Sequence, residues 1–203
     1  MKIICIGRNY SEHARELNSP IPNEPVFFMK PDSSLLLGDK PFFLPEFSRE
    51  IHHEVELIVK INRIGKHIEK QYANRYYNEI TAGIDFTARD LQKKCREEGN
   101  PWEISKSFDG SALLGKFLSL SLFKDTKNIS FHLKMNDKIV QQGTTADMLF
   151  DIDTIISYIS QFVTLKIGDI IYTGTPKGVG PVKVNDHLEG FIEDRKVFDC
   201  EVK

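Results

Sequence analysis

HHEVELIVKI, residues 52–61, is the stretch of sequence that decides how the chain is expected to fold. Its residues alternate with a period of two, which is the repeat of a β-strand, so His53, Val55 and Leu57 fall on one face. The opposite face then carries Glu54 and Glu56. The stretch therefore predicts a strand that presents two neighbouring carboxylates on the same side.

The segments on either side of this strand predict more short strands and only a few short helices. The expected strands lie at 1–7, 25–31, 80–86, 131–143 (a hairpin that turns at Asn136-Asp137), 167–176, and 187–192 with 196–202 as a closing hairpin. Helices are expected at 10–17, 68–77, 87–98 and 151–162, with Ser11, Thr87 and either Asp151 or Asp153 as N-caps of three of them. Strands outnumber helices and do not alternate regularly with them. This order favours a β-rich α+β domain over a doubly wound parallel sheet.

Length and composition exclude several classes of protein. The 203 residues fit a single domain, and 27 Lys and Arg stand against 29 Asp and Glu, so no basic excess favours nucleic-acid binding. No apolar run approaches the ~18 residues that span a bilayer, and the N-terminus lacks the features of a signal peptide. Three widely spaced cysteines (Cys5, Cys95 and Cys200) form no CxxC pair. They predict reduced thiols in a cytoplasmic protein, and any metal would be held by oxygen or imidazole.

Glu54 and Glu56 are candidate metal ligands. On a strand they lie ~6.6 Å apart on one face, where like charges repel unless a cation lies near. Asp85 ends a predicted strand just before a helix whose first turns carry Arg89 and Gln92 on one face. Carboxylates are ligands that Mg²⁺ prefers, so these residues together favour a hard divalent cation.

Several other side chains could bind a metal, catalyse a reaction or bind an anion, but they are also compatible with ordinary positions on the protein surface. His52 adjoins the acids and keeps a zinc or iron site open, whereas alternation places His53 on the other face. His13 and Glu16 share one face of the predicted helix 10–17, an arrangement typical of a general base oriented by a carboxylate. Lys106 lies in a turn-rich segment. Residues 174–181, GTPKGVGP, are not a Walker loop, but their backbone N–H groups could approach an anion.

Six motifs in a fixed order carry a resemblance to a known family. They are GRNYSEH, FFMKP, HHEVEL, DFTARDLQ, KSFDG and TGTPKGVGPV, and they run from Gly7 to near the C-terminus. In this order they resemble the fumarylacetoacetate hydrolase family, and especially its short acylpyruvate hydrolase members. Asn9-Tyr10 stands where the longer members carry an additional acidic ligand, which argues against fumarylacetoacetate as the substrate.

The resemblance implies a fold, a cofactor and a set of site residues. It implies one catalytic domain over 1–203, built as a β-roll of packed mixed sheets with a few short helices, and a homodimer. Residues 10–25 would form a lid over the site. Mg²⁺ or Mn²⁺ would be held by Glu54, Glu56 and Asp85. The implied catalytic residues are His13, Glu16 and Lys106, and the implied substrate-binding residues are Arg8, Lys30, Arg89, Gln92 and Thr175.

The resemblance also implies a reaction on a small 2-oxo acid. The expected reaction is hydrolysis of a C–C bond in acylpyruvates, which yields pyruvate and a carboxylic acid. Oxaloacetate decarboxylation and isomerisation or tautomerisation of a 2-oxo acid at the same metal site stay open. A non-catalytic ligand-binding member is the remaining alternative, and the presence of the acids, the His–Glu pair and the lysine argues against it.

Overall fold

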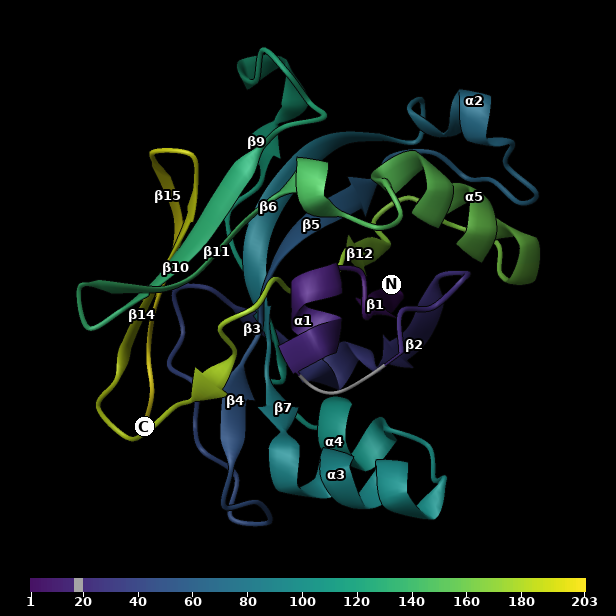
Figure 1. Cartoon of the computed structure of the whole chain (residues 1–203). Helices are drawn as coiled ribbons and strands as arrows, with labels where there is room; N and C mark the ends of the chain where they lie inside the picture. Colours follow the sequence, from purple (N-terminus) through teal and green to yellow (C-terminus); the bar gives the residue numbers. More distant parts are fainter. Residues whose placement is uncertain (17–19) are drawn as a thin grey trace.

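The protein is described by a computed structural model that covers residues 1–16 and 20–203. An eight-stranded mixed sheet forms its centre (Figure 1). The strands follow the order β2–β1–β12–β5–β6–β8–β3, and β9 also pairs with β6. Two pairs, β1 with β12 and β3 with β8, are parallel, and the other neighbours are antiparallel. The bounds are β1 Ile3–Gly7, β2 Val26–Lys30, β3 Leu35–Leu37, β5 Val55–Ile61, β6 Tyr77–Asp85, β8 Ala112–Leu114, β9 Leu118–Ser119 and β12 Ile170–Tyr172.

Two smaller sheets flank this centre. A four-stranded antiparallel sheet has the order β11–β10–β14–β15, and a three-stranded sheet has the order β13–β4–β7. The hairpin between β10 and β11 turns at Asn136 and Asp137, which both have positive φ (52° and 66°), as a tight hairpin turn requires. The bounds are β4 Ile51–His53, β7 Thr87–Ala88, β10 Ser130–Met135, β11 Lys138–Thr144, β13 Gly180–Pro181, β14 His187–Ile192 and β15 Arg195–Glu201.

The helices are short and lie around the sheets. In Figure 1, α3 and α4 lie beyond β7 at one end of the molecule, and α2 and α5 lie together at the other. The side chain of Asp151 accepts from Thr154 N (2.8 Å) and caps α5, and Gly99 ends α3 with φ 69°. The bounds are α1 Ser11–Glu16, α2 Lys70–Ala73, α3 Arg89–Glu98, α4 Glu103–Lys106 and α5 Ile152–Phe162, with 3₁₀ turns at Asp32–Ser34, Leu120–Leu122 and Thr145–Asp147.

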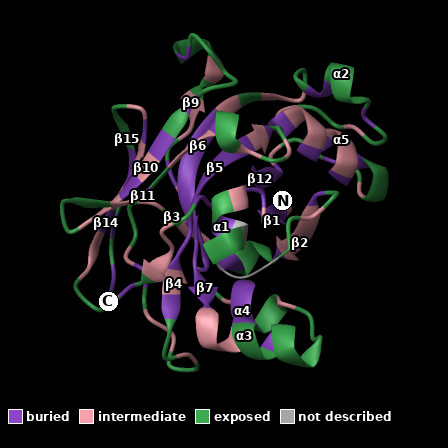
Figure 2. Cartoon of the chain, viewed as in Figure 1, coloured by how far each residue is buried: buried purple, intermediate pink, exposed green. Residues whose placement is uncertain are grey.

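The main core lies against β5 and β6, which Figure 2 shows as buried along most of their length. Val55, Leu57 and Val59 belong to this core, as alternation predicts. The opposite face of β5 is buried too, and Ile58 packs there in a second apolar cluster with residues of β1 and β12. Glu54 and Glu56 therefore lie in the interior of the protein.

The β-rich α+β architecture of packed mixed sheets is confirmed, and so are the hairpins. Three local predictions are wrong. The strand 52–61 is divided at Glu54, because β4 pairs with β13 and β7 whereas β5 pairs with β12 and β6. The helix expected at 68–77 covers only Lys70–Ala73, since β6 already begins at Tyr77. Thr87 does not cap α3, because it pairs with His52 in β7. Of the predicted helix 10–17 and the lid 10–25, residues 17–19 lie outside the described residues.

Candidate active site

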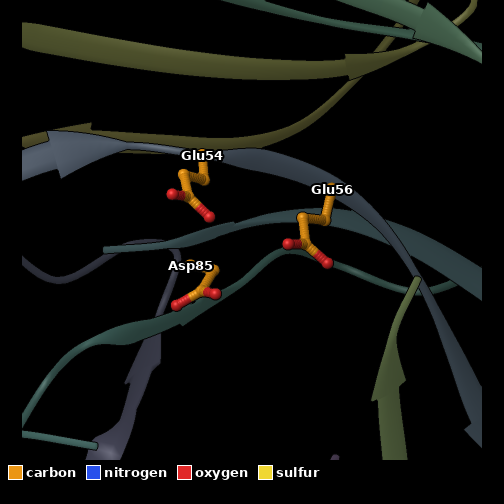
Figure 3. A group of neighbouring side chains, drawn as sticks. All are labelled: Glu54, Glu56 and Asp85. Carbon is orange, nitrogen blue, oxygen red and sulfur yellow. The ribbon is translucent and has the colours of Figure 1, made fainter. Parts of the chain in front are cut away.

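Three buried carboxylates meet where the strands β5 and β6 begin and end. Glu54 lies at the break between β4 and β5, Glu56 is the second residue of β5, and Asp85 is the last residue of β6. The pairing of Val55 with Ile84 brings them together, and Asp85 N donates to Glu54 O (2.9 Å). One oxygen of each carboxylate lies within 4.8 Å of the others, and Figure 3 shows the side chains turned toward one space. None of the three is more than 4% exposed.

Three buried or half-buried cations surround these acids. Lys106 Nζ lies 2.7 Å from both Glu54 Oε2 and Asp85 Oδ2. Arg89 Nη2 lies 2.6 Å from Glu54 Oε1, and Lys30 Nζ lies 2.7 Å from Asp85 Oδ1. Glu56 has no such cationic partner among the described residues and accepts a hydrogen bond from Gly174 N (2.7 Å).

The charges divide the acids into two kinds. Burial alone would raise the pKa of Glu54, but Lys106 and Arg89 hold it below its usual range. Burial, together with the charges of Asp85 and Glu54, raises the pKa of Glu56 well above its usual value. Burial opposes the charged form of Lys106, but Asp85 and Glu54 outweigh it and raise the pKa of that ammonium. Glu56 therefore lacks a neighbouring positive charge that would stabilise its ionised form.

A divalent cation fits this donor set. The three carboxylates offer oxygen ligands, which Mg²⁺ and Mn²⁺ prefer. Asp85 Oδ1 is buried and has no hydrogen-bond donor among the described residues, although Lys30 Nζ lies close. An oxygen that is desolvated but not hydrogen-bonded is suited to bind a cation. Glu54, Glu56 and Asp85 are the residues that would hold it.

His13 lines the same cavity as the acids, and Glu16 contacts its imidazole. Both residues lie on α1, and His13 Nδ1 is 3.2 Å from Glu16 Oε2. His13 is only 5% exposed, whereas Glu16 is exposed and accepts from Gly178 N at 3.2 and 3.3 Å. The Gly-rich loop after β12 thus holds the carboxylate that contacts the imidazole.

A cavity of about 40 Å³ joins these groups. Three of the predicted substrate-binding residues, Arg8, Gln92 and Thr175, line it, and two do not. Arg89 binds Glu54 and donates to Gln92 Oε1 (2.5 Å). The described lining residues are Ile6, Gly7, Arg8, His13, Phe28, Glu54, Glu56, Asp85, Gln92, Arg96, Trp102, Lys106 and Thr175.

Lys30 lies behind the acids rather than in the cavity. Its side chain is 0% exposed, and its ammonium donates to Lys106 O, Ser111 O (3.0 Å) and Ser111 Oγ (2.9 Å). Through these contacts Lys30 holds the carboxylate of Asp85 and the backbone of Lys106 in place.

The two adjacent histidines do not join the acids. His53 Nδ1 lies 2.7 Å from Gln141 Oε1, and His52 Nε2 lies 3.0 Å from Glu50 Oε1. Burial lowers the pKa of both imidazoles. In the described part of the chain the acidic group contains no imidazole, so the geometry favours an oxygen-bound cation over zinc or iron.

Gln141, which no sequence pattern singles out, is a buried residue whose side chain links the two neighbours of Glu54 in the chain, His53 and Val55, to the loop after β12. Its Oε1 accepts from Val55 N (3.0 Å) and contacts His53 Nδ1. Its Nε2 donates to Thr175 Oγ1 (2.9 Å) and to Pro176 O (3.0 Å). Nothing in the local sequence separates this residue from the exposed Gln142 beside it, because the partners lie 34 to 88 positions away.

Known proteins resemble the whole chain. Residues 2–203 match the family described as fumarylacetoacetate (FAA) hydrolase C-terminal. A protein of Bos taurus named oxaloacetate tautomerase FAHD1, mitochondrial, is 42% identical over 94% of this chain and 86% of its own length. The mitochondrial oxaloacetate decarboxylase of Dictyostelium discoideum is 43% identical over 90% of this chain and 84% of its own length. The fumarylpyruvate hydrolase of Pseudomonas aeruginosa, solved with Mn²⁺ and pyruvate, superposes with a TM-score of 0.93 at 31% identity, over 100% of this chain and 89% of that one.

Proposed function

The chain belongs to the fumarylacetoacetate hydrolase family, and we propose that it is a divalent-metal enzyme that interconverts the keto and enol forms of oxaloacetate. The observation that carries the proposal is a cavity that is lined both by a buried carboxylate triad and by His13, whose Nδ1 contacts Glu16. Tautomerisation needs both parts, because charge develops on the keto oxygen while a proton leaves carbon. Decarboxylation of oxaloacetate needs no base, so the His–Glu pair favours proton transfer.

Glu54, Glu56 and Asp85 would hold Mg²⁺ or Mn²⁺. When bound, the ion would act as a Lewis acid that stabilises negative charge on the keto oxygen of a 2-oxo acid. Two relatives are named for reactions of oxaloacetate, and the Pseudomonas structure contains Mn²⁺, which supports both the substrate and the kind of ion.

His13 is the proposed base. Glu16 holds Nδ1, so Nε2 is the ring nitrogen available to take a proton from C3 of the substrate. As the C3–H bond breaks, its electron pair forms the C2–C3 double bond, and the keto oxygen takes the charge. His13 then gives up the proton that it took, the keto oxygen gains one through solvent, and the enol is complete. The reverse path returns a proton from His13 to C3.

Lys106 and Thr175 are proposed to assist at the other atoms. The charged ammonium of Lys106 lies beside two of the acids and would stabilise charge on the substrate oxygen. Thr175 accepts a hydrogen bond from Gln141, and within residues 1–16 and 20–203 its hydroxyl makes one long contact of its own, with Pro176 O (3.4 Å). Its hydroxyl proton can therefore be donated to a substrate carboxylate.

Hydrolysis of acylpyruvates is the second candidate reaction, and it would use the same site residues. The likeness to a fumarylpyruvate hydrolase favours it. In this reaction His13 would remove a proton from water rather than from C3. The water oxygen would add to the C4 carbonyl carbon, and the C3–C4 bond would then break to give a carboxylic acid and a pyruvate enolate.

One experiment separates these reactions. The purified protein with Mg²⁺ or Mn²⁺ is given enol oxaloacetate, and the ultraviolet absorbance of the enol is followed while pyruvate is measured in parallel. We expect the enol to disappear faster than pyruvate forms. Faster pyruvate release from acetylpyruvate or fumarylpyruvate than enol conversion would favour the hydrolase, and pyruvate release that keeps pace with enol loss would favour the decarboxylase.

We further propose that the chain acts as one catalytic domain with α1 as part of a lid. Lys177 Nζ lies 3.0 Å from Glu12 Oε2, so a second contact joins α1 to the loop that holds Glu16. No helix in the described part of the chain is long and apolar enough to cross a membrane. A cytoplasmic location and a homodimer stay predictions, and the bovine and Dictyostelium relatives carry the word mitochondrial in their names.

A further inference from the structure

The carboxylate of Glu56 is held differently from those of the other two acids. Cationic side chains pair with Glu54 and Asp85, whereas no cation pairs with Glu56 in the part of the chain that the structure describes. Its Oε2 accepts a hydrogen bond from Gly174 N (2.7 Å), and the residue is 2% exposed. The orientation of this backbone N–H therefore bears directly on how the carboxylate of Glu56 points.

This N–H belongs to the peptide group between Thr173 and Gly174, just after β12. A planar trans peptide points its C=O and its N–H in opposite directions. The C=O end, Thr173 O, accepts from Asn9 Nδ2 (2.8 Å). Because β1 and β12 are parallel neighbours, the residues that follow the two strands lie side by side (Figure 1). One peptide group thus connects the side chain of Asn9 on one side to the carboxylate of Glu56 on the other.

Gly174 gives this peptide group the freedom to turn over unless something holds it. Its φ is 102°, a backbone conformation that favours glycine. A Cβ at this position would lie 2.7 Å from the Cβ of Asn9, so a larger residue does not fit there. If the peptide turned over, Thr173 O would face Glu56, and two hydrogen-bond acceptors would meet in a buried site. The hydrogen bond from Asn9 opposes this rotation, because it holds the C=O end.

The side-chain amide of Asn9 is itself fixed by the backbone. Its Oδ1 accepts from Phe150 N (2.8 Å), and its Nδ2 donates also to Phe150 O (3.0 Å). These two backbone partners determine which end of the amide is the oxygen and which is the nitrogen. Asn9 is 0% exposed, and its backbone O accepts from Leu149 N (2.8 Å). Asn9 Nδ2 is therefore a donor in a fixed position.

We propose that Asn9 is a positioning residue for Glu56, because its amide holds the Thr173–Gly174 peptide with the N–H directed at that carboxylate. The inference rests on the proposed function, in which Glu56 is a ligand of Mg²⁺ or Mn²⁺. Asn9 is not among the described residues that line the cavity, so it acts through the peptide group. A hydrogen bond to the C=O end also polarises the peptide and strengthens its N–H as a donor.

Binding of the cation alone tests the proposal. Calorimetric titration with Mg²⁺, and separately with Mn²⁺, gives the dissociation constant, while the stoichiometry reports the folded fraction of each variant. Residues that orient a metal ligand change metal affinity by about 10–100-fold when they are mutated. We therefore expect the dissociation constant to rise at least about tenfold in Asn9→Ala. Asn9→Ser, which keeps a polar group, should weaken binding in the same direction and serves if Asn9→Ala does not fold.

Ser160→Ala is the matched control. Ser160 is a buried residue of α5, and its Oγ accepts from Ile68 N (2.8 Å). Like Asn9, it is a buried side chain that binds a distant backbone group, but it lies on the helix that packs with α2 (Figure 1). Its loss should lower the stability of the protein and change the Mg²⁺ dissociation constant by less than about twofold.

Hydrogen exchange of single backbone amides, followed by NMR without metal, gives a second readout. In Asn9→Ala we expect exchange of the Gly174 amide to accelerate at least about tenfold relative to that of the Ile68 amide. Ser160→Ala should have the reverse effect, because it removes the acceptor of Ile68 N. A general loss of stability would accelerate both amides together. The pattern of exchange therefore separates positioning of Glu56 from overall stability.

The outcomes distinguish this inference from the proposed function. An unchanged metal affinity in the Asn9 variants, or equal acceleration of both amides, would overturn the inference. If the wild type binds the cation but does not convert oxaloacetate, the proposed reaction fails and the role of Asn9 stands. If the wild type binds neither cation, the proposed metal site fails, and exchange of the Gly174 amide still decides whether Asn9 positions Glu56.

Discussion

The protein contains two charge clusters with similar contact distances and opposite surroundings. The buried cluster lies under the cavity, with ion-pair distances of 2.6 to 2.7 Å, and comprises Glu54, Glu56, Asp85, Lys30, Arg89 and Lys106. The exposed cluster lies on β14 and β15, with distances of 2.6 to 3.0 Å, and comprises His187, Glu189, Lys196 and Asp199. Side chains are at most 12% exposed in the ion pairs of the first and mostly above 40% in those of the second.

The difference shows that the distance between two charges does not by itself determine how much an ion pair contributes to the stability of the folded protein. Water screens the exposed cluster, and such pairs contribute about 0–1 kcal/mol. In the buried cluster a charge that loses its partner stays desolvated, which costs about 3–5 kcal/mol. The buried cluster is therefore expected to govern both stability and chemistry, and the exposed cluster neither.

Asp85→Asn should have the largest effect. It removes a ligand and leaves Lys30 and Lys106 with less compensating charge, so turnover of every 2-oxo acid should fall by about 10³-fold. The free energy of unfolding should fall by about 3 kcal/mol. Steady-state kinetics, urea unfolding and the rise of Tm on adding Mg²⁺ measure these effects. Asp199→Asn in the exposed cluster is the control, with no loss of turnover and less than about 1 kcal/mol of stability. Equal effects of the two variants would refute the contrast.

His13→Ala tests the base that faces the buried cluster. Loss of a general base costs about 10²–10⁴-fold, so tautomerisation of oxaloacetate and any acylpyruvate hydrolysis should slow by that amount. Decarboxylation should slow distinctly less, because it needs the metal site and no base. Absorbance of the enol and release of pyruvate are compared in one preparation. A proportional loss of all activities would mean that His13 positions substrate or closes the lid.

Gln141→Leu should lower kcat/KM by about tenfold, the equivalent of one or two hydrogen bonds. The variant removes the hydrogen bonds through which the Gln141 amide links Val55 N to Thr175 Oγ1. We therefore expect KM to rise more than kcat falls. The matched control is Gln142→Leu on the exposed side of the same strand. Kinetics with thermal unfolding distinguish positioning from stability. A drop in Tm without a change of KM in Gln141→Leu would argue for a purely structural residue.

The smallest effect is expected from the exposed cluster as pH changes. The hydrogen bond to Asp199 raises the pKa of His187, so the folded state favours the charged imidazole. This stabilisation is complete below the ordinary histidine pKa of about 6.5 and is lost as pH rises through the raised value. His187→Gln should therefore destabilise the protein by less than about 0.5 kcal/mol at pH 5.5 and by nothing measurable at pH 8.5. Urea unfolding of both proteins at the two pH values measures this, and a loss of several kcal/mol would contradict the comparison.

Local patterns in the sequence were sufficient for much of the fold. Alternation located β5, the Asn136-Asp137 turn located a hairpin, and the two candidate caps Asp151 and Asp153 located the start of α5 to within two residues. These signals work because strand period, turn conformation and helix capping depend on residues a few positions apart. Strand and helix periodicity made the acids and the His13–Glu16 pair candidates, and the order of the motifs assigned them roles through a family resemblance.

Only the tertiary structure decided which of those residues share one site. Alternation could not show that the strand changes sheets at Glu54, or that the second face of β5 is covered by β1 and β12 instead of water. The resemblance implies that Lys30 contacts the substrate, and the structure places its side chain behind Asp85, away from the cavity. Gln141 carried no local signal at all. Burial and partnership arise from segments far apart in the chain, and those contacts, rather than the identity of any one residue, determine the charge and the shape of the cavity.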